Sequence, residues 1–157
     1  MFCIDASQML LASGGTDKSV YVWNVESKQK LYDVKHNHSV SSVVFKNSML
    51  ISASLDKTCK ISNKDDGRLL KTLEHGGKCN SIDIKGNLMA VAYGNNGECG
   101  GVSVWNIENF SKIEEYQFKQ ITDVRFQSDS RIIFASNDGW IYKIELRKIY
   151  QPAKISS

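Results

Sequence analysis

The chain has 157 residues, of which 41% are hydrophobic and 24% are charged, and its formal net charge is +3. This length suits one domain, and the composition excludes collagen-like, mucin-like and disordered chains. No apolar run approaches the roughly 20 residues that span a bilayer, and the first residues lack the basic and apolar regions of a secretory signal. We therefore expect an intracellular protein, cytoplasmic or nuclear, that is neither secreted nor inserted into a membrane.

The basic residues and the cysteines exclude two further classes. The lysines and arginines are scattered singly, and the longest basic run is Arg147-Lys148. Because nucleic-acid binders present a basic stripe to the phosphates, we expect no specific nucleic-acid partner. The cysteines form no CxxC pair, the spacing that typically begins a zinc site, so we expect reduced, packed thiols and neither a metal site nor a cofactor. The four cysteines are Cys3, Cys59, Cys79 and Cys99.

In chain order, the first regular segment is Leu11–Asn24, which reads LASGGTDKSVYVWN. Val20 and Val22 alternate with Tyr21 in the period of two that is typical of a half-buried strand, and a Gly-Gly pair marks a turn. The same pattern returns 39 residues later in Leu50–Asn63, which reads LISASLDKTCKISN. The two copies predict a repeating unit of short strands.

Two further copies follow towards the C-terminus. Gly101–Asn106 lies a further 43 residues on, with the extra residues in the loop Gly94–Gly101, and Asp138–Ile144 follows at an offset of 39. The connections leave no room for a helix, so we expect four strands in each unit. The strand that precedes the repeated segment also recurs, as Val40–Phe45, Cys79–Ile84 and Ile121–Phe126.

A period near 40 residues, four strands per unit and a Trp-Asn pair near the third strand resemble the WD40 repeat of β-propellers. The resemblance extends from Met1 to about Tyr150. It implies an all-β fold, a WD40-type β-propeller or a contiguous part of one, with about four blades of four antiparallel strands. The expected units are about 1–35, 36–74, 75–116 and 117–157, within a single WD40-repeat region at 1–157.

In that family a His, a Ser or Thr, an Asp and a Trp of each repeat form a buried hydrogen-bonded network. No unit of this chain carries all four. Ser62 and Ile144 stand at Trp positions, Val91 at a Ser position and Gln117 at a His position. The resemblance also places Trp23 and Trp105 in the core. The network residues that it assigns are Ser13, Asp17, Trp23, His36, Ser52, Asp56, His75, Trp105, Ser136 and Asp138.

Several motifs resemble metal-binding, catalytic or phosphate-binding motifs, but a structural role explains them better. His36-Asn37-His38 offers two metal ligands without an evident third, and an Asp that recurs in one turn position organises backbone amides. The glycine-rich loop Gly94–Gly101 is followed by a strand rather than by the helix of a phosphate-binding loop, but it remains a candidate contact loop. No catalytic pattern such as GxSxG or HExxH occurs. We therefore expect no catalytic residues and no enzyme.

Partners of this family usually dock on the loops that flank one face of the propeller. Trp140 stands out among the candidates there. It is a large aromatic residue, whereas the residues at the same position of the other units, Ser19, Thr58 and Gly101, are all small. Trp is enriched at interfaces, although Trp140 would alternatively pack between blades and fill the space left by Ile144. The candidate partner-binding residues are His38, Leu55, Lys57, Asn96, Glu98 and Trp140.

The two ends of the repeat array do not determine how the propeller ring closes. The offset aligns Met1 with Val40, inside a unit, and the outer strand of the fourth unit would fall near 150–154. Each blade buries a face on its neighbour, so an open array leaves two apolar faces in water. Three alternatives follow. The chain is part of a longer propeller chain, it forms half of an oligomeric ring, or its four blades close into a small ring.

The resemblance implies a non-enzymatic protein–protein interaction scaffold or adaptor subunit of a larger complex, which binds other proteins through propeller loops. The alternative is a structural protein whose incomplete ring closes by self-association or with another propeller chain, through faces around Phe2, Ile4 and Ile149. The Trp-Asp-x-Arg motif of cullin-type ubiquitin-ligase adaptors is absent after Trp23 and Trp105, which argues against that role.

Overall fold

The computed structural model describes residues 3–95, 99–119 and 121–146. These residues form 15 β-strands in four antiparallel sheets, and each strand pairs with the next one along the chain within its sheet. The prediction of an all-β fold with about four antiparallel blades is confirmed. We call the sheets blades 1 to 4. Within the described ranges, no helix is long and apolar enough to cross a membrane.

The first two blades have four strands each. Blade 1 contains β1 (Cys3–Ser7), β2 (Leu10–Gly14), β3 (Ser19–Asn24) and β4 (Lys30–Lys35). Blade 2 contains β5 (Val40–Lys46), β6 (Met49–Ser54), β7 (Thr58–Asn63) and β8 (Leu69–Glu74).

The other two blades follow the same order. Blade 3 contains β9 (Lys78–Lys85), β10 (Leu88–Gly94), β11 (Cys99–Asn106) and β12 (Ser111–Lys119). Blade 4 contains β13 (Ile121–Ser128), β14 (Arg131–Ser136) and β15 (Ile141–Glu145). The outer strand expected near 150–154 lies outside the described residues, as do Phe2 and Ile149.

The turns between strands use left-handed backbone conformations. Gly67, in the β7–β8 turn, has φ of 74°, where a side chain is strained. A Cβ at this position would also collide with the ring of Tyr32 from blade 1. The Tyr32 hydroxyl donates a hydrogen bond to the carbonyl oxygen of Lys64, so this turn also joins blade 1 to blade 2.

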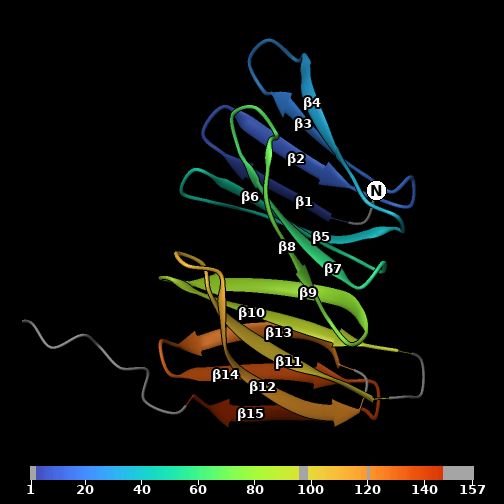
Figure 1. The fold of residues 1–157 in the computed structure, drawn as a ribbon, viewed down its shortest axis with the longest axis vertical. Coiled ribbons are helices and arrows are strands. Elements are labelled where there is room, and N and C mark those ends of the chain that lie inside the picture. Colours follow the sequence, from blue (N-terminus) through green and yellow to red (C-terminus); the bar gives the residue numbers. More distant parts are fainter. Residues whose placement is uncertain (1–2, 96–98, 120, 147–157) are drawn as a thin grey trace, which may run out of the picture.

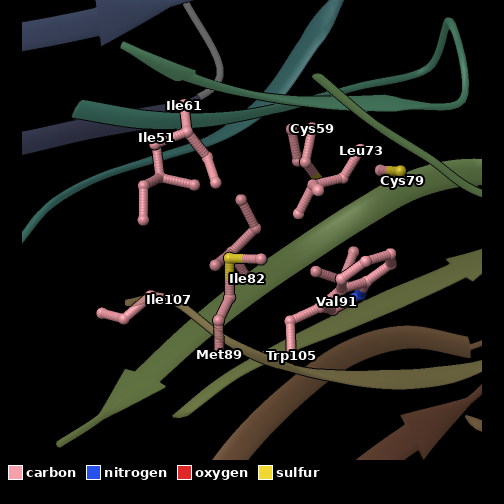
Figure 2. Packing of buried hydrophobic residues seen from close by; sticks show 11 residues of the cluster. Ile51, Cys59, Ile61, Leu73, Cys79, Ile82, Met89, Val91, Trp105 and Ile107 are labelled. Carbon is pink, nitrogen blue, oxygen red and sulfur yellow. The ribbon is translucent and has the colours of Figure 1, made fainter. Parts of the chain in front are cut away.

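The blades stack face to face along the long axis of the molecule, from β1–β4 at one end to β15 at the other (Figure 1). Three apolar clusters fill the spaces between successive blades. In the middle layer, side chains of blade 2 such as Ile51 and Ile61 face Met89 and Val91 of blade 3 (Figure 2). Because burying one such side chain contributes about 1.5–3 kcal/mol, these layers hold the blades together.

Carboxylates on the innermost strands add polar contacts between blades. One Asp5 oxygen accepts a hydrogen bond from the backbone N–H of Phe45 at 2.6 Å. Asp83 makes the same contact with the N–H of Phe126, also at 2.6 Å. Each of these contacts therefore fastens the inner strand of one blade to that of the next.

The described array is open, because blades 1 and 4 lie at opposite ends of the stack (Figure 1). Large apolar side chains are exposed on both end faces. Ile4 of β1 is 56% exposed, and Ile141 of β15 is 77% exposed.

Candidate functional site

In blade 2, three predicted network residues come together from different segments. His36 lies in the β4–β5 connection, Ser52 on β6 and Asp56 in the β6–β7 turn. The Nε2 atom of His36 is 2.9 Å from Ser52 Oγ, and its Nδ1 atom is 3.1 Å from Asp56 Oδ2. The network therefore ties a connection between blades to a turn within blade 2.

The protonation states in this network follow from burial and hydrogen bonding. Burial lowers the pKa of His36 below its ordinary value, although Asp56 opposes this. Burial raises the pKa of Asp56, but hydrogen bonds from Thr58 and from the N–H of Asn37 outweigh it and bring the pKa down to about 2. A neutral imidazole beside an ionised carboxylate must donate from Nδ1 to Asp56 and accept the Ser52 hydroxyl at Nε2.

The order Ser52, His36, Asp56 matches that of a hydrolase triad, in which the serine must reach its substrate. Here Ser52 is 2% exposed and His36 is 5% exposed. A substrate cannot approach a buried hydroxyl, so the chemistry open to this group is hydrogen bonding within the fold.

Blade 3 keeps the histidine of this pattern but lacks both its serine and its aspartate, whose position in the repeat is occupied by Cys99. Val91 replaces the serine, and its cross-strand partner Ser103 carries the hydroxyl instead. The indole N–H of Trp105 donates to Ser103 Oγ at 2.9 Å, so the hydroxyl has moved to the neighbouring strand. His75 is left without a hydrogen-bond partner for either ring nitrogen, and its ring lies 5.6 Å from that of Trp105.

Blade 1 does not complete the network. Trp23, which the resemblance places in the core, is half-buried, because no described blade covers the face of blade 1 on which it lies. Its ring is 6.4 Å from that of Tyr21. Ser13 is half-buried, whereas Asp17 is exposed, and among the described residues its carboxylate makes no hydrogen bond. Trp105, in contrast, is 8% exposed and belongs to the core.

Blade 4 shows a different pairing from the one expected. The N–H of Asp138 contacts Ser136 Oγ at 3.5 Å, as the N–H of Asp56 contacts Ser54 Oγ in blade 2 at 3.1 Å. Ser136 therefore corresponds to Ser54 rather than to Ser52, whose position Phe134 occupies. Asp138 Oδ2 accepts instead the hydroxyl of Tyr142 at 2.8 Å.

Two cysteines and the unpartnered histidine form a cluster that sequence analysis missed. Cys59 of β7, His75 and Cys79 of β9 place their donor atoms within 4.8 Å of one another. Burial raises the pKa of Cys59, whereas the neighbouring Cys59 and His75 lower that of Cys79. The repeat offered a signal, because Cys59 and Cys79 align with Val20 and Val40, which belong to one apolar cluster between blades 1 and 2.

The candidate partner-binding residues that the structure describes lie along one edge of the stack, which we call the loop rim. They are His38, Leu55, Lys57 and Trp140. The rim comprises residues 15–18, 36–39, 54–57, 75–77 and 136–140. Backbone hydrogen bonds link its segments in sequence: Lys18 O accepts from His36 N, Ser39 O from Leu55 N, and Lys57 O from His75 N, at 2.8–3.0 Å.

Exposure differs among the rim candidates. Trp140 is 70% exposed, so it does not fill the space between blades; Ile144 packs there with Phe118 and Tyr142 instead. His38 and Lys57 are exposed, and Leu55 is half-buried. Asn96 and Glu98 lie outside the described residues.

Two cavities border these features. A cavity of about 640 Å³ follows the inner strands β1, β5, β9 and β13. Its carboxylates are already engaged: Asp5 and Asp83 on backbone amides, and Asp123 on Ser81 and Arg125. A cavity of about 280 Å³ lies at the loop rim beside Lys119 and Asp138. In the second cavity, Asp138 is likewise engaged, since it accepts the hydroxyl of Tyr142.

The blade geometry agrees with comparisons to known proteins. The family described as "WD domain, G-beta repeat" matches residues 2–24 and 28–63. The chain is also 35% identical over 126 residues to the Arabidopsis thaliana transcriptional corepressor LEUNIG_HOMOLOG, covering 75% of this chain and 15% of that protein. The chain belongs to the WD40-repeat β-propeller family, as the sequence analysis predicted.

Solved structures share the fold. The computationally designed Ika4 protein has a TM-score of 0.84 and 21% identity, covering 93% of this chain and 91% of that one. The RRP9 WD40 repeats have a TM-score of 0.78 and 25% identity, covering 93% of this chain and 46% of that one. The chain spans 10 to 40% of the length of three curated relatives. WD40 propellers generally act as protein-interaction scaffolds and are generally not enzymes.

Proposed function

We propose that the chain acts inside the cell as a non-enzymatic scaffold or adaptor subunit of a larger complex, and that it binds partner proteins through the loop rim. The observation that carries this proposal is Trp140, which is 70% exposed at the rim. Trp supplies large contact area with few rotatable bonds, which makes it a frequent energetic centre of interfaces. His38 and Lys57 extend the polar part of the same surface.

The rigidity of the rim supports the same function. The His36 network anchors the 36–39 connection to the 54–57 turn, since Asp56 accepts hydrogen bonds from Asn37 N at 2.8 Å and from Thr58 N at 3.0 Å. Loops held in this way lose little conformational freedom on binding, so more of the contact energy appears as affinity.

Two lysines on the rim occupy strained backbone positions. Lys18 and Lys57, which are equivalent in the repeat, have φ of 65° and 73°. Gly139 stands at the same turn position in blade 4 with φ of 87°. Turns away from the rim adopt the same left-handed conformation at Gln8 and Asn47, so this backbone geometry is shared by the turns of the blades.

Single substitutions at the loop rim test the proposal. The proteins that co-purify with the intact protein are quantified for the wild type, Lys57→Glu, Trp140→Ala and Arg68→Glu. Arg68 is an exposed cation in the β7–β8 turn, at the opposite edge of the stack, and its charge change matches that of Lys57→Glu. We expect a partner that Arg68→Glu retains and both rim variants lose. The same set of bound proteins in all four samples would contradict the proposal.

A second candidate function is ring closure by self-association. Ile141, which is 77% exposed, aligns in the repeat with Val20, Cys59 and Val102, which are all 0% exposed because the next blade covers them. The face of blade 4 is therefore shaped for a further blade. We propose that blade 1 of a second copy, with Ile4 and Trp23 on its open face, is its occupant.

Two copies would repeat between chains the contact that already joins successive blades within one chain. A contact between unlike faces generates a closed ring when the rotation per subunit closes. The similar chain of the RRP9 WD40 repeats is about twice as long as the matched part, since 46% of it is covered. Two copies of this chain together would have about the same length.

A further inference from the structure

Cys59, His75 and Cys79 lie together in the apolar layer between blades 2 and 3. Both cysteines are 0% exposed and His75 is 9% exposed. The two cysteines come from different blades and lie close together at one end of the layer (Figure 2). Two thiols and an imidazole are the donor types that Zn²⁺ prefers in proteins.

The geometry of the cluster is close to that of a metal site. All donor atoms lie within 4.8 Å of one another. With Zn–S distances of about 2.3 Å and Zn–N distances of about 2.0 Å, the donors of a tetrahedral site are about 3.5–3.8 Å apart. From a separation of 4.8 Å, each pair of donor atoms needs to approach by about 1.0–1.3 Å at most to reach these distances.

His75 gives an independent reason to expect a ligand. Both of its ring nitrogens are buried and lack a hydrogen-bond partner, whereas the equivalent His36 in blade 2 uses both of its nitrogens. A buried imidazole that lacks hydrogen-bond partners destabilises the fold, because it has lost its contacts with water. Blade 3 therefore keeps His75, although Val91 stands where the serine that would bind this histidine is expected. The ring nitrogens of His75 lie close to the sulfur atoms of Cys59 and Cys79 instead.

We propose that Cys59, His75 and Cys79 bind one Zn²⁺ ion, which joins blade 2 to blade 3. Binding forms two Zn–S bonds and one Zn–N bond and releases the two protons that the three side chains share. Two thiolates balance the charge of the ion, so the complex is neutral, as its apolar surroundings require. The Tyr93 ring lies 5.8 Å from that of His75, and its hydroxyl is already engaged, since it donates to Glu115 at 2.6 Å.

The repeat supplies variants that remove a ligand without harming the packing. Cys59 aligns with Val20 and Val102, and Cys79 aligns with Val40 and Ile121, all of them buried. Cys59→Val and Cys79→Val therefore place a side chain that this fold already uses at the same position. Cys3→Ser is the matched control, since Cys3 lies between blades 1 and 2, near the carbonyl oxygen of Val40 at 4.0 Å.

Metal titration tests the proposal. The reduced, metal-free protein is titrated with Co²⁺, whose thiolate complexes absorb visible light, and Zn²⁺ is then added as a competitor. Circular dichroism confirms that each variant is folded. We expect one ion per chain, displacement of Co²⁺ by Zn²⁺, and an affinity for Zn²⁺ that falls more than about 10-fold in both valine variants but is unchanged in Cys3→Ser.

Three outcomes would overturn the proposal. The first is the absence of thiolate-to-cobalt absorption in the folded, reduced wild type. The second is binding that persists in Cys59→Val and Cys79→Val, because the ion would then lie elsewhere. The third is a protein that binds Cu⁺ but not Zn²⁺.

Discussion

At the scale of single residues, the His36 network makes the stability of the fold depend on acid. The pKa of Asp56 in the folded chain is about 2, below the value of about 3.9 expected for an unfolded chain. Stability from this group is therefore complete above about pH 4 and is lost as the pH falls through 2. Burial also lowers the pKa of His36, so protonation of the unfolded chain removes further stability below about pH 6.5.

Urea unfolding at a series of pH values checks this account. We expect the free energy of unfolding of the wild type to fall from pH 7 to pH 3, and Asp56→Asn to weaken the acid dependence below pH 4. At pH 7, Asp56→Asn should cost about 1–3 kcal/mol. Asp17→Asn, at the equivalent position in blade 1, should change the stability by less than about 0.5 kcal/mol. Equal effects of the two variants would contradict the role of the network.

Family positions predict which residues approach one another, but not how a blade adjusts when one of them changes. The resemblance identified His36, Ser52 and Asp56 by position alone, and these three side chains meet. It did not predict that Ser103 supplies the hydroxyl missing at Val91, because the cross-strand register of β10 and β11 is a property of the folded sheet. The cluster around His75 has the same origin, since its members come from two blades.

At the scale of strands and turns, most of the structure could be predicted from local sequence patterns. The period of two and the turn glycines predicted the repeated strands, because strand exposure and left-handed turns are decided by neighbouring residues. The last repeated segment, expected from Asp138, begins as a strand only at Ile141. The residues before it form a turn, in which Ser136 N donates to Trp140 O at 3.0 Å and Gly139 has φ of 87°.

The contacts between inner strands were not predictable from local signals and have a measurable effect. Asp83 accepts the Phe126 N–H at 2.6 Å across the blade boundary. Since hydrogen bonds to charged groups contribute about 1.5–3 kcal/mol, we expect Asp83→Ala to lower the free energy of unfolding by that amount. Hydrogen exchange at the Phe126 amide should accelerate as well.

Asp129→Ala is the control for this variant. Its side chain is 92% exposed and reaches Lys85 only at 3.7 Å, so removing it should change the stability by less than about 0.5 kcal/mol. If Asp83→Ala were as stable as Asp129→Ala, the carboxylate would not fasten blade 3 to blade 4.

At the scale of the whole molecule, the repeat predicts the number of blades and the face that each presents. Val20, Cys59, Val102 and Ile141 occupy one position in successive blades, and three of them are covered by the blade that follows. The occupant that we propose for the face around Ile141 was not predictable from the sequence, because a blade face has the same pattern whichever chain packs on it. The function that we propose at this scale depends on two kinds of surface, the loop rim and the two end faces.

The molar mass of the folded 157-residue chain, measured by light scattering during size exclusion, tests this claim most directly. The wild type and Ile141→Glu are compared, with Leu31→Glu as a control for charge at an exposed leucine of β4. We expect the wild type and Leu31→Glu at about twice the monomer mass of 17.6 kDa and Ile141→Glu at 17.6 kDa. A folded wild type at 17.6 kDa would contradict closure of the end faces by a second copy.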